Sequence, residues 1–102
     1  MVGAQLDDAY PEFAVARERF LRDYCYNTAR AYWSDLDDVL WWAHERGKDP
    51  LALTEDDFKA YLRLLKRRGY AASTVRRRGT AFRGLEISVG KAERRATGRQ
   101  SE

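Results

Sequence analysis

The sequence predicts an all-α protein, a compact bundle of four or five short helices. Apolar residues recur at spacings of three and four along most of its 102 residues. No stretch alternates apolar and polar residues for long enough to form a strand, and the Asn-Gly and Asp-Gly pairs typical of tight hairpins are absent. A chain of this length has room for one domain with one core, and 44% hydrophobic residues can fill that core.

The first two helices are predicted from their apolar faces. Residues 12–24 place five apolar side chains on one stripe, which predicts a helix. Residues 27–46 form the second helix, which Asn27 or Cys25 would cap and Gly47 would end. The inward-facing residues of the two helices are Phe13, Ala16, Phe20, Leu21 and Tyr24, then Tyr32, Leu36, Val39, Leu40 and Ala43.

The third helix has the clearest predicted limits. Thr54 begins the stretch "TEDD", a cap followed by acidic residues in the first turn, where the helix dipole favours negative charge. The helix ends at Gly69, directly after the basic run "KRR" in its last turn. Phe58, Tyr61, Leu62 and Leu65 are expected to face inward.

The fourth helix is expected from Ser73 to about Phe82. Gly79 and Gly84 each cost roughly 1 kcal/mol against alanine in a helix interior. A continuous helix would also bring an acidic residue, Glu86, to the apolar side. Fraying or a break is therefore expected between residues 84 and 90.

These helices define one predicted domain, residues 12–89. Residues 1–11 are expected to be an N-terminal extension, and residues 90–102 a basic, disordered tail. The acidic start does not resemble a signal peptide, and no apolar run approaches the ~18 residues of a membrane span. One cysteine excludes an internal disulfide and fits a reducing compartment. The protein is expected to be cytoplasmic and nucleoid-associated, without a membrane partner.

Charge is divided unevenly along the chain. Residues 1–58 hold 6 Lys/Arg and 13 Asp/Glu, a net charge of −7, whereas residues 59–102 hold 13 Lys/Arg and 3 Asp/Glu, a net charge of +10. The basic half indicates a polyanion such as nucleic acid as partner. The alternative is that the acidic half neutralises the basic half within the fold.

The basic residues of the fourth helix are predicted to form an exposed strip. Arg76 and Arg83 nearly coincide in a helical projection, Thr80 falls beside them, and Arg77 lies on the flank. The strip contains no acidic residue until Glu86, so the usual pairing with a carboxylate one turn away is absent. Such a strip can follow a phosphate backbone or reach guanine edges, although a solvated helix face is the commoner fate of charged residues.

The end of the third helix adds positive charge immediately before this strip. Its last turn contains Lys66, Arg67 and Arg68. These three residues join the strip as candidate DNA-binding residues.

Catalytic and metal chemistry is not predicted. Asp35, Asp37 and Asp38 are interpreted as a solvated helix face, because no histidine or glycine-rich loop supports them as ligands. Cys25 has no evident activating base, and the single histidine, His44, leaves no metal cluster. The prediction is therefore a protein with no metal, no cofactor and no small-molecule substrate.

Several short motifs occur in a characteristic order. "FLRDY" precedes a Thr-x-x-x-Tyr-x-x-Asp-Leu pattern that begins at Thr28, and "ERG", "DPLALTEDDFKAYL" and "STVRRR…AFRGL" follow. Over residues 13–85 the sequence resembles the N-terminal core-binding (SAM-like) domain of tyrosine recombinases and phage integrases. The resemblance implies short helices that clamp one side of double-stranded DNA, with the second and fourth helices approaching the major groove. It also implies other recombinase protomers as partners.

The resemblance assigns residues by position. It places Thr28 and Arg30 at the DNA from the start of the second helix. From the fourth helix it assigns Ser73, Thr74, Arg76, Arg77, Thr80 and Arg83.

The sequence departs from the family pattern at several places, including the ending after Leu85, where "EISVGKAERRATGRQSE" replaces the usual aromatic helix ending. Cys25-Tyr26 and Ala71-Ala72 stand where the family often has Ser-Pro, so capping is expected to shift to Asn27 and Ser73. Gly79 replaces a large apolar residue. The Arg, His-x-x-Arg and nucleophilic Tyr of the recombinase catalytic domain have no counterpart, so this chain is not expected to be an enzyme.

The predicted function is a non-catalytic DNA-binding module that grips duplex DNA through basic helix faces. The alternative is a protein-interaction or regulatory decoy that acts on a full-length recombinase. Trp41, beside the acidic residues of the second helix, and the acidic first half would carry that contact.

Overall fold

The computed structural model describes the backbone of residues 2–100 and the side chains of residues 6–91. All regular structure in this part of the chain is helical, which confirms the predicted all-α class. The five helices are α1 (Val2–Ala9), α2 (Pro11–Leu21), α3 (Tyr26–Glu45), α4 (Glu55–Arg67) and α5 (Ala72–Gln100).

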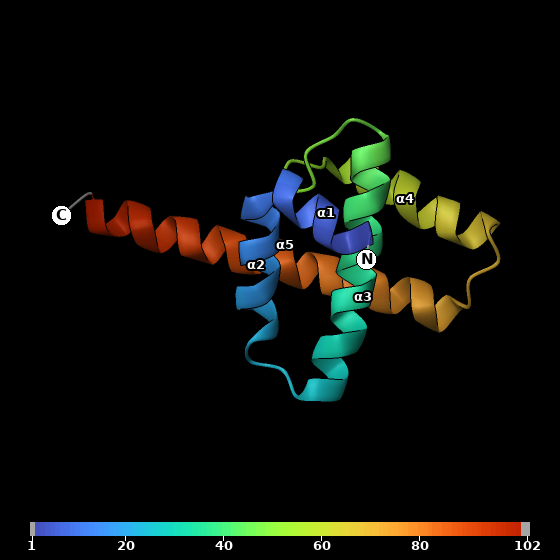
Figure 1. The fold of residues 1–102 in the computed structure, drawn as a ribbon, viewed down its shortest axis with the longest axis horizontal. Coiled ribbons are helices and arrows are strands. Elements are labelled where there is room, and N and C mark those ends of the chain that lie inside the picture. The colour runs from blue at the N-terminus through green and yellow to red at the C-terminus, as the bar shows by residue number, and fades with distance from the viewer. Residues whose placement is uncertain (1, 101–102) are drawn as a thin grey trace.

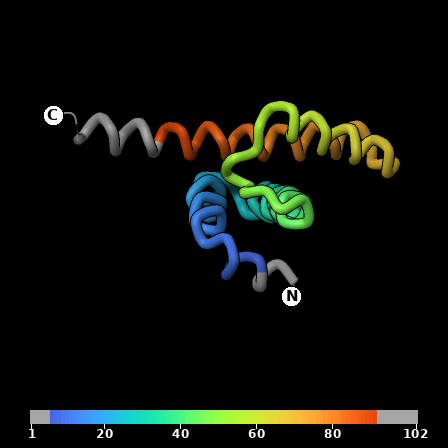
Figure 2. The backbone as a smooth tube through the Cα atoms, turned by 90° about the horizontal axis from the view of Figure 1, so that it is seen from above, coloured from blue at the N-terminus to red at the C-terminus, as the bar shows by residue number. Residues whose placement is uncertain are grey.

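The helices form two layers. α4 and α5 run alongside each other in one layer, and α2 and α3 lie in the other (Figures 1 and 2). α3 and α5 cross near the middle of the bundle, and both ends of α3 extend beyond the crossing (Figure 1). In the view of Figure 1, α3 begins at the bottom and α5 begins at the right.

The core lies where the layers meet. Leu36 and Leu40 of α3 and Leu85 of α5 have no exposed surface, and Phe82 and Tyr61 are almost completely buried beside them. Burial of these apolar side chains supplies the largest favourable contribution to folding. The prediction that Tyr24 faces inward is wrong: α2 ends at Leu21, and Tyr24 is 41% exposed.

The predicted limits of α4 are confirmed by its capping. The Thr54 amide donates to Asp57 Oδ2 at 3.0 Å, and the Asp57 amide donates to Thr54 Oγ1 at 3.1 Å, which completes a capping box. Gly47 and Gly69 follow α3 and α4 with φ of 69° and 86°, a left-handed conformation that favours glycine.

The expected break in the fourth helix is wrong. α5 continues without interruption to Gln100. At Gly84 the absence of a side chain admits the ring of Phe20 against the helix backbone, so packing offsets the low helix propensity of glycine. Leu85 continues the buried face, while Glu86 lies at its exposed edge. The tail expected to be disordered is helical as far as Gln100, and the side chains of residues 92–100 and all of residues 101–102 lie outside the described part.

The N-terminal segment expected as an extension contributes α1 to the bundle. Leu6 is 5% exposed in the core, and Asp7 accepts a hydrogen bond from Arg17 Nη2 at 2.7 Å. Arg17 is itself buried and lies over the Trp33 ring at 4.6 Å. This contact fixes α1 to α2 and α3.

Two glycines of α5, Gly79 and Gly84, should respond oppositely to alanine. A Cβ at Gly84 would lie 2.7 Å from Phe20 Cζ, and that ring is stacked on Tyr32, so Gly84→Ala should lower the free energy of unfolding by about 1–2 kcal/mol. A Cβ at Gly79 would meet Phe58 at an ordinary 3.7 Å, so Gly79→Ala should raise it by up to about 1 kcal/mol. Urea unfolding followed by circular dichroism measures both. Equal stability of the two variants would contradict the close packing of Phe20 on α5.

Candidate nucleic-acid interface

The C-terminal half of α4, the following turn and the N-terminal half of α5 form a basic corner, residues 59–85. This stretch contains nine Lys/Arg and no Asp or Glu. Lys66 and Arg67 in the last turn of α4 complement the negative end of the helix dipole, and Gly69 then turns the chain toward α5. The cations of two helices are thereby concentrated in one part of the surface.

Two arginines of the corner are bound to a buried carboxylate of α3. Arg77 donates from Nε and Nη2 to the two oxygens of Asp35, at 2.7 and 2.9 Å. Arg78 donates from Nε to Asp35 at 3.2 Å and from Nη1 to Asp38 at 2.8 Å. The Asp35 side chain is 1% exposed, so the interpretation of this residue as part of a solvated face is wrong. A buried carboxylate requires such partners because desolvation without them is very unfavourable.

The same cluster includes two tyrosines. The Tyr61 hydroxyl donates to Asp38, and burial together with this hydrogen bond raises the pKa of Tyr61 far above its usual range. The Arg78 guanidinium lies 4.7 Å from the centre of the Tyr70 ring. The Arg78 side chain is only 12% exposed and is part of the packed interior. Arg77 keeps 44% of its side chain exposed.

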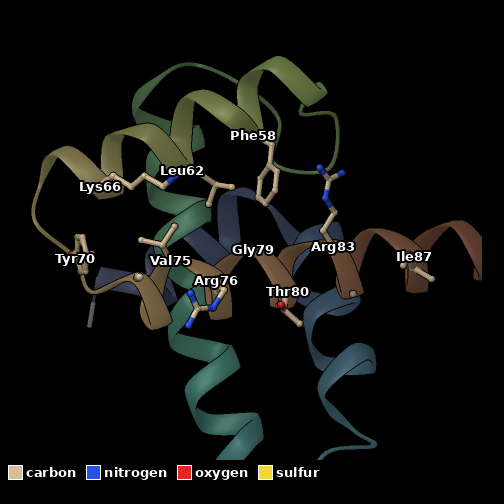
Figure 3. Close-up of a pocket in the computed structure, with 12 residues that line it drawn as sticks. Phe58, Leu62, Lys66, Tyr70, Val75, Arg76, Gly79, Thr80, Arg83 and Ile87 are labelled. Carbon is tan, nitrogen blue, oxygen red and sulfur yellow. The ribbon is translucent and has the colours of Figure 1, made fainter.

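Arg83 pairs with carboxylates at the surface. It donates to Glu55 at the start of α4, lies 3.6 Å from Glu86, and covers the Phe58 ring at 4.6 Å. The hydrogen bond that Arg83 donates to Glu55 raises the pKa of Arg83, although partial desolvation opposes the shift. Figure 3 shows its side chain directed toward α4.

The expectation that the strip would be unpaired is therefore wrong for Arg77 and Arg83. A helical projection considers only carboxylates on the same helix, whereas Asp35 and Glu55 come from α3 and α4. These two acidic partners are the site residues that the sequence pattern did not identify. Only the uneven charge of the two halves of the chain indicated internal neutralisation.

The other predicted cations are exposed and have no ion pair among the described side chains. On α5 this holds for Arg76, which points away from α4 beside Thr80 (Figure 3). It also holds for Arg30 near the start of α3. At the end of α4 the same is true of Lys66, Arg67 and Arg68.

An apolar groove of about 960 Å³ separates the end of α4 from α5. Phe58, Leu62 and Val75 contribute to its apolar lining, and Lys66 and Arg76 lie on opposite sides of it (Figure 3). The groove therefore combines an apolar floor with a cationic rim.

The helices predicted to face DNA begin one residue earlier than expected. α3 starts at Tyr26 with Cys25 as N-cap and no side-chain cap, and Val75 N–H bonds to the Ala71 carbonyl at the start of α5. The expected caps Asn27 and Ser73 are thus inside the helices. α3 has no side-chain cap, and alanine carries no side-chain acceptor, so both helix starts are suited to a phosphate oxygen.

The predicted hydroxyls lie close to these helix starts. Ser73 is exposed in the first turn of α5, and Thr74 is half-buried. Thr28 is half-buried in the first turn of α3 and accepts a hydrogen bond from Cys25 Sγ at 3.4 Å. The predicted DNA-binding residues thus gather on the corner and on the two helix starts.

Among the described residues, no three His, Cys, Asp or Glu side chains are grouped to hold a metal ion. No described helix has the length and apolar character to cross a membrane.

A known domain family matches most of the chain. The family described as phage integrase, N-terminal SAM-like domain, matches residues 19–86, which is 68 of the 102 residues. The chain belongs to this family. Neither a curated protein nor a solved structure matches the chain. As an integrase N-terminal domain it is a recombinase-related DNA-binding module, and the matched domain is non-catalytic. The match begins within α2, so α1 precedes the family domain.

The pair of Glu55 and Arg83 should be visible in an acid titration of this integrase domain. The hydrogen bond from Arg83 lowers the pKa of Glu55. The stabilisation of the folded state by this pair is therefore complete above the unfolded-state pKa of glutamate, about 4.3. That stabilisation is lost as the pH falls through the lower pKa of Glu55 in the folded state. Arg83→Gln should raise the pKa of Glu55 toward its ordinary value, measured by NMR of the side-chain carboxyl carbon. Arg76→Gln is the control and should leave that titration unchanged, whereas an unchanged value in Arg83→Gln would exclude the pair.

Proposed function

We propose that this integrase N-terminal domain grips duplex DNA with the basic corner and the starts of α3 and α5. The observation that supports this most strongly is a group of exposed cations at the corner that have no ion pair among the described side chains: Lys66, Arg67, Arg68 and Arg76. The stretch of chain that carries these cations contains no carboxylate, so no neighbour in the sequence neutralises their charge. A surface with such uncompensated positive charge attracts the phosphate backbone of DNA.

The residues take different roles in this proposal. Arg76 and Arg30, for which the described side chains supply no ion pair, bind phosphates. Thr28, Ser73 and Thr74 donate from hydroxyls beside the amide groups of the two helix starts. Thr80, next to Arg76 on the outer side of α5, contacts a phosphate or a thymine methyl group.

Arg83 joins the interface by exchanging partners. Its pair with Glu55 is exposed on both sides, at 46% and 52%, and such pairs contribute little to stability. A phosphate can therefore replace Glu55 at small cost. Binding of DNA then transfers Arg83 from an intramolecular carboxylate to the DNA backbone.

Further recombinase protomers bound at neighbouring positions on the DNA are the additional partners we propose. The alternative of a decoy acting through Trp41 receives no support from its surroundings. Trp41 is half-buried and packs edge-on against His44, with ring centres 5.9 Å apart. It therefore does not offer the exposed anchor that this alternative requires.

Arg76→Gln should weaken binding to a fluorescein-labelled random-sequence duplex about tenfold at low salt, because one contact between an arginine and a phosphate is lost. The slope of log K against log salt should become less steep by about 1. Fluorescence anisotropy at several salt concentrations measures both quantities.

Arg46→Gln provides a matched control for this variant. Arg46 is exposed and follows the C-terminal end of α3, at the opposite end of that helix from Arg30, and its replacement removes the same charge. It should leave the salt slope unchanged. If the two variants lost affinity equally, the contribution of Arg76 would be general charge and the proposed interface would be wrong.

Glu55→Gln should tighten binding to the same duplex several-fold, because Arg83 no longer needs to leave a carboxylate. The salt slope should steepen by up to about 1. Asp56→Asn is the matched control, since Asp56 is the next residue of α4, is exposed and has no ion pair with Arg83. An equal gain in both variants would show only the removal of negative charge and would contradict the exchange of partners.

A further inference from the structure

Among the described cations of the basic corner, Arg77 alone is well exposed and also held by a buried carboxylate. Asp35 holds two of its nitrogens at 2.7 and 2.9 Å, and this carboxylate is buried in the crossing of α3 and α5. The Arg77 side chain nevertheless keeps 44% of its surface exposed. By contrast Arg76, one residue earlier, has no ion pair among the described side chains.

The donors that remain on Arg77 form a second fork. A guanidinium group carries five N–H donors in one plane. Asp35 accepts from Nε and from one hydrogen of Nη2, so the edge made by Nη1 and Nη2 keeps its donors. No described side chain accepts a hydrogen bond from Nη1 of Arg77. This free edge has the spacing that matches O6 and N7 of guanine, or two oxygens of a phosphate.

Local charge favours the guanine over the phosphate. Asp35 and Asp38 balance the charges of Arg77 and Arg78, so the cluster as a whole attracts a phosphate only weakly. Hydrogen bonding to a base edge depends on direction more than on net charge, and Asp35 fixes the direction. Arg77 also lies in the second turn of α5, and the N-terminal residues of a helix in the major groove are those that reach base edges.

This inference rests on the proposed function, the binding of duplex DNA. We propose that Arg77 recognises a guanine in the major groove. Asp35 is its positioning residue, which holds the guanidinium so that the Nη1–Nη2 edge faces the base. Arg77 then supplies sequence preference, while Arg76 and the cations at the end of α4 supply affinity. The bidentate pairing contributes a preference of roughly 5- to 100-fold for guanine over another base at one position.

Selection from a randomised duplex library tests this assignment in the folded domain. The wild-type domain should enrich a motif with guanine at one position. Arg77→Lys keeps the charge and a contact with Asp35 but lacks the second edge, so it should retain the rest of the motif and lose the guanine. Arg76→Lys is the matched control and should enrich the wild-type motif. Melting temperatures of both variants confirm that they are folded.

Replacement of that guanine by 7-deazaguanine distinguishes a base contact from a phosphate contact. This base lacks the N7 acceptor but leaves the backbone unchanged. The wild-type domain should bind the altered duplex at least severalfold more weakly, and Arg77→Lys should bind both duplexes equally. If Arg77→Lys lost affinity for all duplexes alike, Arg77 would be a phosphate contact or a structural residue and the assignment would be wrong.

Asp35→Asn tests the positioning role. Loss of the buried negative charge should tighten binding to all duplexes while the guanine preference falls, a combination that a purely structural residue would not produce. If this variant does not fold, Arg77→Lys and 7-deazaguanine still decide the role of Arg77. An Asp35→Asn protein that is folded and keeps the full preference would overturn the positioning role.

Failure of this assignment can be separated from failure of the proposed function. A wild-type domain that binds duplex DNA with steep salt dependence but enriches no motif would overturn the role of Arg77 and leave DNA binding intact. A wild-type domain that binds no duplex at low salt would overturn both.

Discussion

The buried carboxylate of Asp35 is the contact on which the rest of the structure depends. It lies where α3 crosses α5 and accepts hydrogen bonds from Arg77 and Arg78, two residues 42 and 43 positions later in the chain. Burial of a charge costs several kcal/mol, and a buried ion pair often contributes little net stability. The Asp35 cluster nevertheless restricts the geometry of the bundle, because two guanidinium groups of one helix must both reach the same carboxylate. Apolar contacts between Leu36, Leu40 and Leu85 would tolerate a rotation of α5, whereas the Asp35 cluster does not.

The same cluster changes the meaning of the uneven charge along the sequence. The excess of acid in the first half and of base in the second half indicated either a nucleic-acid partner or internal neutralisation. Both interpretations hold, for different arginines. Asp35, Asp38 and Glu55 from the first half neutralise three arginines of the basic corner, and the other six cations of the corner have no ion pair among the described side chains. The surface charge is thus smaller than the sequence suggests and is concentrated at the end of α4 and on Arg76.

The features that the sequence predicted correctly are those that depend on residues close together in the chain. The capping box at Thr54, the left-handed glycines at Gly47 and Gly69, and the inward faces of the helices all depend on residues within one or two turns. The family could also be identified, because the spacing of its motifs survives in the chain. These features required no knowledge of how the helices pack.

The errors arose where a distant contact outweighs a local preference. Gly84 lowers helix propensity, yet the ring of Phe20 packs against the backbone that this glycine leaves open, so α5 does not break. Asp35 stands among other acidic residues on α3, which suggests a solvated face, and only the position of α5 reveals its two partners. Which arginines of the strip are free could not be predicted for the same reason, since their carboxylates belong to other helices.

Burial gives two similar arginine–carboxylate contacts opposite consequences for binding. The pair between Arg83 and Glu55 is exposed, so water and ions compete for both partners and a phosphate can replace the carboxylate. The pair between Arg77 and Asp35 has one partner shielded from solvent, and separating it would leave an uncompensated charge inside the protein. The first contact is therefore exchangeable and the second persistent. An exchangeable arginine suits a backbone whose phosphates are alike at every position, whereas a persistent one keeps the fixed direction that discrimination between bases requires.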